Sequence, residues 1–104
     1  MGQISTRTTT GVSASTPMVL NTMITPFNVG IGCVVTSTAT YTIQHTFDDP
    51  QNIVTWFNHD DTGLVNATGN ANGNYAYPVT ASRINQTSGS GSVTATYVQA
   101  GIIN

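Results

Sequence analysis

The most regular pattern of the chain lies in residues 38–47, TATYTIQHTF. Larger or apolar side chains alternate there with threonines and one glutamine, and the larger set is Ala39, Tyr41, Ile43, His45 and Phe47. A period of two puts such a set on one face of a β-strand. The preceding run, NVGIGCVVT at residues 28–36, alternates in the same way, with an inward set of Val29, Ile31, Cys33 and Val35. We expect the two runs to form a β-hairpin through Ser37.

The composition favours an all-β fold. Charged residues make up 6% of the 104 residues, against roughly 25% in ordinary globular domains. Lysine and glutamate are absent, and threonine, serine, asparagine and glycine take their place. Lysine, glutamate and leucine favour helices, whereas threonine and valine favour strands. The surface must then be solvated by hydroxyls and amides rather than by charges.

Further short runs with strand character lie at residues 17–20, 53–57, 75–85 and 93–101. The segment 66–74, NATGNANGN, is expected to be a loop, because asparagine and glycine tolerate positive φ. In the last run, Val93, Ala95 and Tyr97 are expected to face inward. About six or seven short strands separated by turn residues predict a single antiparallel β-sandwich, jelly-roll-like or immunoglobulin-like, or a small barrel.

A chain of this length forms one domain. Residues 1–16 are polar, with few large apolar side chains, among them Ile4 and Val12. Such a segment is typical of an arm or an edge strand rather than a core element. We take residues 1–16 as an extended N-terminal arm that lies along a neighbouring subunit, and residues 17–104 as the β-sandwich domain.

The charge pattern disfavours a nucleic-acid partner, because the net charge is −2 and the chain has only Arg7 and Arg83 as cations, whereas phosphate binding needs clustered cations. Apolar runs fall far short of the roughly 18 residues of a membrane-spanning helix. The N-terminus lacks the apolar core of a secretory signal. We therefore expect no nucleic-acid or membrane partner and synthesis in the cytoplasm. The single cysteine, Cys33, permits no intramolecular disulfide, and its aliphatic neighbours predict a buried thiol.

Residues 41–61, YTIQHTFDDPQNIVTWFNHDD, contain both histidines and all four carboxylates. They form two groups, His45 with Asp48 and Asp49, and His59 with Asp60 and Asp61. Such groups offer the ligand types of zinc; an acid–base pair and two polar turns are the alternatives. A five-residue strand at 53–57 would separate the groups by roughly 16 Å. We therefore expect the aspartates to close turns, with no metal site and no cofactor.

The chain lacks the motifs of common catalytic sites, including a Gly-x-Ser-x-Gly turn, a phosphate loop and His-Glu-x-x-His. Adjacent aspartates at a strand end point apart, which disfavours the facing carboxyls of a glycosidase. We expect no enzymatic activity. His45 is expected either to be half-buried with a hydrogen-bond partner or to face a partner surface.

Aromatic side chains are the remaining candidates for recognition. Trp56 and Phe57 are adjacent and so face opposite sides of an extended segment, and Tyr75 and Tyr77 share a face. Aromatic residues are enriched in protein interfaces and suit sugar-binding platforms, although each can equally fill a core. The residues expected at interfaces are Ile4, Arg7, Val12, Trp56, Phe57, His59, Tyr75 and Tyr77.

Four segments stand out together: PFNVGIG at 26–32, YTIQHTFDD at 41–49, WFNH at 56–59 and NGNYAYPV at 72–79. With them the chain resembles, over about residues 26–100, small virion proteins that tailed bacteriophages encode among their structural genes. Some of these proteins are taken to be head decoration, or cement, proteins. The resemblance implies no catalytic residue.

The resemblance implies a non-enzymatic capsid decoration protein on the surface of the virion head, made in the cytoplasm of a host bacterium. Its partners would be the major capsid protein and copies of itself, with a trimer favoured. Extended segments and strand edges would add main-chain hydrogen bonds between subunits. The alternative is a tail, fibre or collar component, with aromatic residues that bind glycans.

Overall fold

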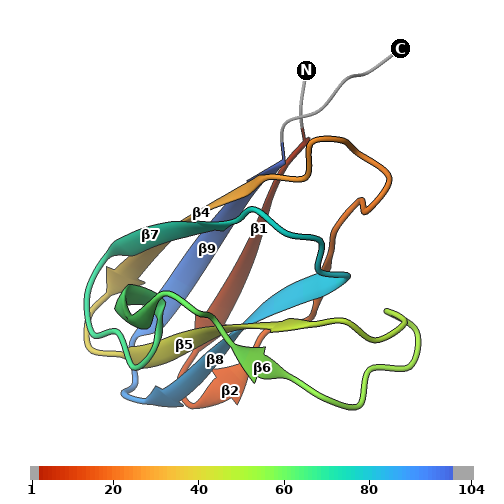
Figure 1. Cartoon of the computed structure of the whole chain (residues 1–104). Coiled ribbons are helices and arrows are strands. Elements are labelled where there is room, and N and C mark those ends of the chain that lie inside the picture. Colours follow the sequence, from red (N-terminus) through yellow and green to blue (C-terminus); the bar gives the residue numbers. More distant parts are fainter. Residues whose placement is uncertain (1–2, 100–104) are drawn as a thin grey trace.

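The computed structural model describes residues 3–99, which form two antiparallel β-sheets packed face to face (Figure 1). Sheet A has the strand order β1-β9-β4-β7, and sheet B has the order β2-β8-β5-β6, with β3 also paired to β8. The predicted all-β sandwich is confirmed. The elements are β1 Gln3–Thr10, β2 Ser13–Ala14, β3 Met18–Val19, β4 Val29–Thr36, β5 Thr40–Thr46, β6 Phe57–Asn58, the 3-10 helix η1 Thr62–Leu64, β7 Ala71–Tyr75, β8 Ala81–Ser88 and β9 Ser92–Gln99.

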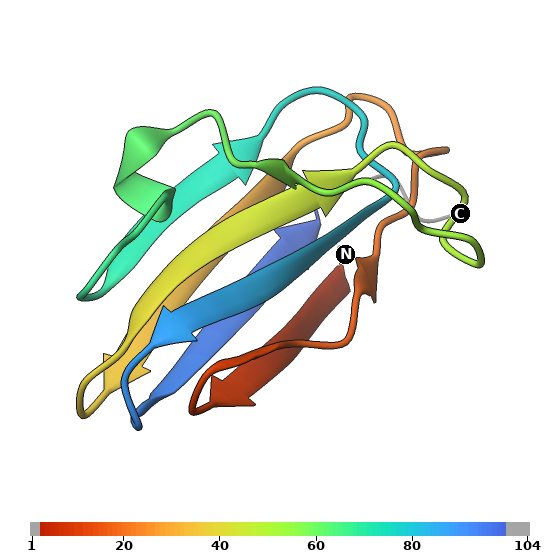
Figure 2. The same ribbon diagram turned by 90° about the horizontal axis from the view of Figure 1, so that it is seen from below.

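The core lies between the inner faces of the two sheets, which Figure 2 shows one above the other. Most inward positions predicted for these runs are buried, whereas Val35 is only partly buried. The buried ones are Val29, Ile31, Cys33, Ala39, Tyr41, Ile43, His45, Val93, Ala95 and Tyr97. Burial of one such large apolar side chain stabilises a fold by roughly 1.5–3 kcal/mol. Within residues 3–99, no helix has the length and the hydropathy needed to cross a membrane.

The predicted hairpin between residues 28–36 and 38–47 is wrong, because β4 lies in sheet A and β5 lies in sheet B. The chain changes sheets at Ser37, which has a φ of 68°. A second corner, at Gly89–Gly91, carries the chain from β8 to β9, and the amide of Gly91 donates to the carbonyl of Thr38 at 2.8 Å. The two corners therefore pack on each other instead of closing two hairpins.

The second corner depends on two glycines. Gly89 has a φ of 91°, which side chains rarely adopt. A Cβ there would overlap the carbonyl oxygen of Thr38 and come within 2.8 Å of the Cα of Ala39, and a Cβ at Gly91 would also overlap the backbone of Thr38. The backbones of the two corners can approach so closely only without these side chains.

The N-terminal segment is part of the sandwich, so the division into an arm and a domain is wrong for residues 3–16. β1 pairs with β9 without a break from Gln3↔Gln99 to Thr10↔Ser92, and β2 pairs with β8. The edge-strand alternative is the one that the structure shows. Arg7 fixes the segment further, because its guanidinium donates to the carbonyls of Thr6, Thr16 and Pro17.

Two further boundaries differ from the expectation. Residues 53–56 form no strand, and only Phe57 and Asn58 pair with β5. Residues 71–75, predicted mostly as loop, form β7, because their backbone pairs with β4 from Cys33↔Ala71 to Val29↔Tyr75. Asparagine and glycine there are tolerated at the edge of a sheet, where packing demands little of the side chain.

A buried amide links three parts of the fold. The Oε1 atom of Gln86, on β8, accepts from the hydroxyl of Thr9 on β1 at 2.8 Å. Its Nε2 atom donates to the carbonyls of Gly91 at 3.0 Å and Gly89 at 3.2 Å. Gln86 and Thr9 are buried, so the Thr9 hydroxyl would lose its hydrogen bond without access to water, whereas the Gly91 carbonyl also accepts from the amide of Gly11. The side chain thus joins both sheets and the second corner.

We predict that Gln86→Leu lowers the free energy of unfolding by about 2–3 kcal/mol, because the buried Thr9 hydroxyl loses its partner and the carbonyls of Gly89 and Gly91 each lose one hydrogen bond. Urea denaturation followed by circular dichroism measures this change. The matched control is Gln44→Leu on β5, whose amide bonds Asn58 and Arg83 near the surface; it should lower stability by less than about 1 kcal/mol. Equal losses in the two variants would contradict the role given to Gln86.

Candidate functional site

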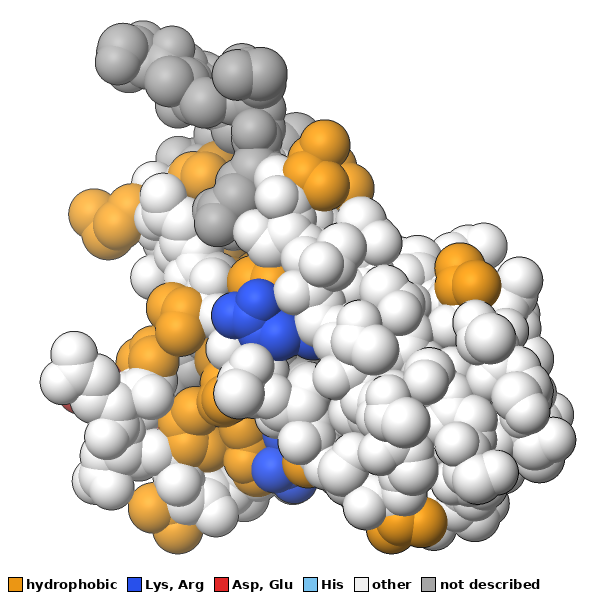
Figure 3. All heavy atoms as spheres, turned by 180° about the vertical axis from the view of Figure 1, so that it is seen from behind, with side chains coloured by type: hydrophobic (Ala, Val, Ile, Leu, Met, Phe, Trp, Pro, Cys, Tyr) orange, Lys and Arg blue, Asp and Glu red, His pale blue; other side chains and the backbone are white. Residues whose placement is uncertain are grey.

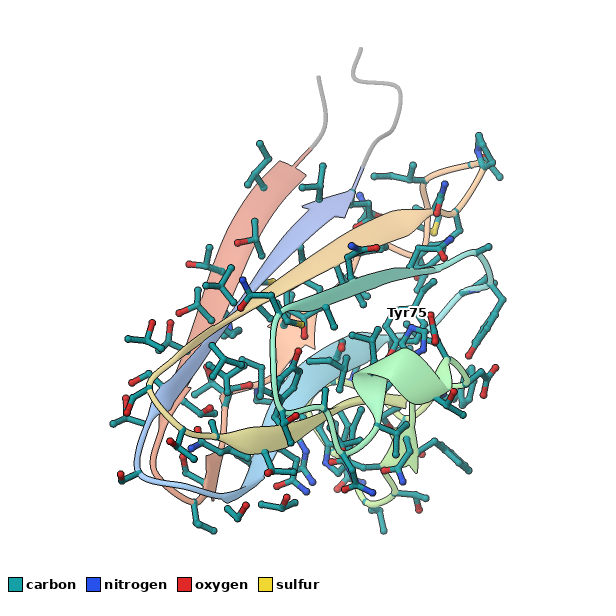
Figure 4. All side chains as sticks on the ribbon, turned by 90° about the vertical axis from the view of Figure 1, so that its left-hand side faces the viewer. Tyr75 is labelled. Atoms are coloured by element: carbon teal, nitrogen blue, oxygen red, sulfur yellow. The ribbon has the colours of Figure 1, made fainter. Side chains whose placement is uncertain are left out.

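Six rings from three segments gather at one end of the sandwich, and we call them the aromatic cluster. Its members are His45, Phe47, Phe57, His59, Tyr75 and Tyr77. The His45 ring lies centrally, with its centroid 5.0 Å from that of Tyr75 and 5.9 Å from that of Phe57. Figure 4 labels Tyr75, which belongs to β7 of sheet A and meets His45 from β5 of sheet B. The cluster therefore spans both sheets.

The cluster exists because the chain reverses after β5. The register His45↔Phe57 and Gln44↔Asn58 lays β6 antiparallel to β5. The predicted separation of roughly 16 Å between the two histidine groups is consequently wrong: the ring centroids of His45 and His59 are 6.4 Å apart. The estimate assumed a straight strand at 53–57, whereas the chain there is a loop that folds back.

Asp48 holds this loop. Its Oδ2 atom accepts from the amides of Val54 and Thr55, both at 2.9 Å. The hydrogen bonds from Thr55 and then Val54 hold the pKa of Asp48 below its ordinary 3.8. Asp49 accepts from the amide of Gln51, and Asp61 accepts from the amide of Gly63. The expectation that aspartates close turns is confirmed for these three.

Asp60 has a different role, since its Oδ2 atom accepts from the phenol of Tyr77 at 3.0 Å. Burial, together with this hydrogen bond to a carboxylate, raises the pKa of Tyr77. Asp60 also acts on His45, where its charge favours the protonated ring. It is thus the one carboxylate of the pair Asp60–Asp61 that bears on the aromatic cluster.

His45 is buried with a hydrogen-bond partner, which is the first of the two placements expected for it. Its Nδ1 atom lies 3.1 Å from the hydroxyl oxygen of Tyr75. Desolvation lowers the pKa of His45 from its ordinary 6.5, the charge of Asp60 opposes this effect, and His59 adds to it. The neutral ring is therefore the form that the folded protein favours.

His59 is held by the main chain on both sides. Its Nδ1 atom accepts from the amide of Asp61 at 2.9 Å, and its Nε2 atom lies 2.9 Å from the carbonyl oxygen of Asn74. Because a carbonyl can only accept, Nε2 carries the proton and donates to it. Both ring nitrogens are thus engaged, and neither is directed at solvent or at a reacting group.

Metal ligands and a reactive thiol can be checked directly within residues 3–99. No three side chains of the types His, Cys, Asp and Glu gather there as metal ligands. The thiol of Cys33 is buried in the core, and desolvation raises its pKa to about 11, so it stays protonated at neutral pH. The buried thiol predicted from the sequence is confirmed.

The outer part of the aromatic cluster reaches the surface. Phe47 and Phe57 expose 53% and 48% of their area, and their ring centroids are 5.7 Å apart. Tyr77 packs beside Phe47 at 6.3 Å. The alternation of residues 38–47 predicted that Phe47 faces the core. This prediction is wrong, because β5 ends at Thr46 and Phe47 lies beyond the strand. Strand alternation loses its meaning once the strand has ended.

The residues expected at interfaces fall into three groups. Ile4, Val12 and Phe57 are exposed. Arg7 is partly buried by its three carbonyl partners, and Trp56 is partly buried beneath Arg83, whose guanidinium carbon lies 4.3 Å from the ring centroid. Tyr77 is likewise partly buried. His59 and Tyr75 are buried, so their placement at an interface is wrong.

A second surface, the outer face of sheet A, carries no charged side chain among its described residues; we call it the threonine face. In-register rows run across it, such as Thr6, Thr96, Gly32 and Asn72. The complete set is Ile4, Thr6, Thr8, Thr10, Gly30, Gly32, Val34, Thr36, Asn72, Asn74, Ser92, Thr94, Thr96 and Val98. Figure 3, which views the molecule from behind, shows arginine side chains in blue beside hydrophobic side chains in orange.

Hydroxyls on the threonine face bond to one another across strands. Thr8 and Thr94 are joined at 3.1 Å, and Thr10 and Ser92 at 3.0 Å. Val34 and Val98 are exposed on the same face, and neither was selected from the sequence. The signal was present, because alternation that turns Cys33 and Tyr97 inward turns the following residue outward.

Comparisons with known proteins give no relative for this chain: no family model matches it, and neither the curated proteins nor the solved structures contain a match.

We predict that stability decreases as the pH falls below about 6.5, because the unfolded chain then binds a proton that buried His45 resists. Urea denaturation between pH 7.5 and 5, as approximate limits of the His range, measures the slope. In His45→Phe, which keeps a ring but does not titrate, the slope should become shallower.

The control is Tyr77→Phe, which removes the hydrogen bond to Asp60 and leaves His45 in place; it should keep a slope close to that of the unsubstituted protein. A His45→Phe slope equal to that of the unsubstituted protein would show that His45 does not govern the pH dependence.

Proposed function

We propose that this chain is a non-enzymatic structural protein of a bacteriophage virion that decorates the outside of the head and stabilises it by contact. The observation that carries the proposal is the threonine face, a broad sheet surface without charge that exposes Ile4, Val34 and Val98. The resemblance of residues 26–100 to small virion proteins supports the same assignment.

An uncharged face suits lasting contact between proteins. The centres of protein interfaces are depleted in charged residues, because desolvating a charge costs far more than desolvating a hydroxyl or an amide that finds a new partner. The hydroxyls of Thr8, Thr94, Thr10 and Ser92 already bond pairwise, and each retains further capacity. Exposed valine and isoleucine side chains among them supply apolar area.

The mechanism is one of linked equilibria. A protein that binds the assembled shell and not its separated subunits stabilises the shell by an amount set by its concentration and affinity. No group of the decorating chain needs to react. The described histidines fit this role, because both are occupied by internal hydrogen bonds.

The first test locates the chain on virions purified from the phage whose genome encodes it. Cryo-electron microscopy and quantitative mass spectrometry should find it on the head surface in hundreds of copies. Its absence from gradient-purified particles would overturn the proposal.

The second candidate is a tail, fibre or collar component, which the exposed Phe47 and Phe57 favour as a platform for glycans. A copy number of a few dozen, with density on the tail, would support this alternative. Glycan-array binding that Phe57→Ala abolishes would identify the platform itself.

We predict that Val34→Glu reduces occupancy on stripped particles at least tenfold, since a carboxylate in the threonine face must be desolvated on contact. Occupancy is measured by rebinding purified chain to particles and quantifying the pellet. The matched control is Val54→Glu, in the loop after Asp48: Val54 is 78% exposed and Val34 is 54% exposed. If the control lost as much occupancy as Val34→Glu, the threonine face would not be the attachment surface.

A further inference from the structure

β1 has a partner on one side only. It ends the order β1-β9-β4-β7, and within residues 3–99 no strand pairs with its other edge. Its register with β9 is unbroken from Gln3 to Thr10, without a bulge or a proline. An edge of this length, without a bulge or a proline, is a template for another strand.

The register shows which groups face that edge. In an antiparallel pair, hydrogen-bonded and non-hydrogen-bonded positions alternate. The amide of Gly11 donates to the carbonyl of Gly91 one position beyond the end of the ladder, so the odd residues of β1 bond to β9. The even residues therefore turn their amides and carbonyls outward. The hydrogen bond from Arg7 Nη1 to the carbonyl of Thr6 agrees with this assignment.

The other sheet edges are short or covered. β2, β3 and β6 have two residues each. On the free edge of β7, the carbonyl of Asn74 accepts from Nε2 of His59 at 2.9 Å. Natural proteins protect sheet edges in these ways. β1 is the long edge in the described chain, and among its outward groups the carbonyl of Thr6 accepts a hydrogen bond from Arg7.

We propose that β1 pairs antiparallel with β1 of a second copy about a two-fold axis, which joins the two A sheets into one continuous sheet. The inference deepens the proposed function and rests on it for its biological role, since it names the self-contact of a decorating chain. A two-fold pair differs from the trimer implied by the resemblance.

The chemistry of β1 favours a second copy as the occupant. A two-fold contact places the same surface on both sides, so the strand must be able to pair with an identical strand without like charges in opposition. The outward side chains of β1 are Ile4 and threonines, which carry no charge. Arg7 is the single charge on the strand. Its guanidinium binds the carbonyls of Thr16 and Pro17 and also the outward carbonyl of Thr6, so it must release Thr6 when a second strand pairs there.

Sheet continuity also selects a register. Outer-face residues must oppose outer-face residues, so even positions pair with even positions. Pairing centred on Arg7 would bring two guanidinium groups into opposition, which is unfavourable. Pairing centred on Thr6 instead opposes Thr6 to itself, Ile4 to Thr8 and Ser5 to Arg7, and it uses residues 3–9 of both copies. We assign this register.

The register is tested by cross-linking Thr6→Cys in the full chain. Opposed hydrogen-bonded residues have Cα atoms about 5.5 Å apart, within the range of a disulfide, and Cys33 is buried and does not compete. Mild oxidation should convert most of the variant to a covalent dimer on non-reducing gels. Thr8→Cys is the matched control, because its two sulfurs would be separated by roughly 13 Å and should not cross-link. Cross-linking of Thr8→Cys alone, or of neither variant, would overturn the proposal.

Solution mass gives the second readout. Sedimentation equilibrium should show a species of twice the 10.9 kDa chain mass that dissociates on dilution. Thr8→Pro removes an outward amide without touching the β9 ladder, and it should raise the dissociation constant about 25-fold, since each of two symmetric hydrogen bonds contributes about fivefold. Thr8→Val keeps the amide and should leave the dimer intact. Dimerisation unchanged by Thr8→Pro, or a monomer at every concentration, would overturn the proposal.

The same variants separate this inference from the proposed function. A chain that is monomeric yet still occupies particles would remove the β1 contact and leave the decorating role. A chain that dimerises through β1 but is absent from virions would keep the β1 contact and contradict the decorating role.

Discussion

The whole sandwich depends on the close packing of two chain corners, fixed by the buried amide of Gln86. Gln86 binds the carbonyls of Gly89 and Gly91 in one corner and the hydroxyl of Thr9 on β1, while the Gly91 amide binds Thr38 in the other. Because neither glycine could carry a Cβ there, the corners meet backbone to backbone. At these two corners the chain passes from β4 in sheet A to β5 in sheet B, and from β8 in sheet B to β9 in sheet A.

This constraint explains what could be predicted from the sequence and what could not. Alternation encodes which side chains of a strand face the core, and the inward sets of β4, β5 and β9 follow from it. Alternation does not encode the partner strand, so Ser37 was expected to close a hairpin although it turns between sheets. The partner strands depend on long-range contacts such as that of Gln86 with Thr9, which no local sequence pattern predicts. The polar β1 was for the same reason expected as an arm.

The candidate site shows the same division. Aspartates that close turns are a local matter, and Asp48, Asp49 and Asp61 do so. The meeting of His45 and His59 is not local, because it requires the chain to reverse between them. Ile53 and Val54 suggested a strand by composition. However, Asp48 accepts hydrogen bonds from the amides of Val54 and Thr55, and these hold the segment as a loop. Two amide hydrogen bonds thus outweighed the strand propensity of a few residues.

The few charges of the chain are used inside the molecule. Arg7 binds main-chain carbonyls, Arg83 lies over Trp56 and binds Gln44, three aspartates bind main-chain amides and Asp60 binds Tyr77. The outer face of sheet A is left to hydroxyls, amides and a few aliphatic side chains. Long-range steering by charge is therefore weak, and its contacts should depend little on salt. In the proposed contacts, specificity would then come from shape and from main-chain groups at a sheet edge, which are positioned by the fold itself.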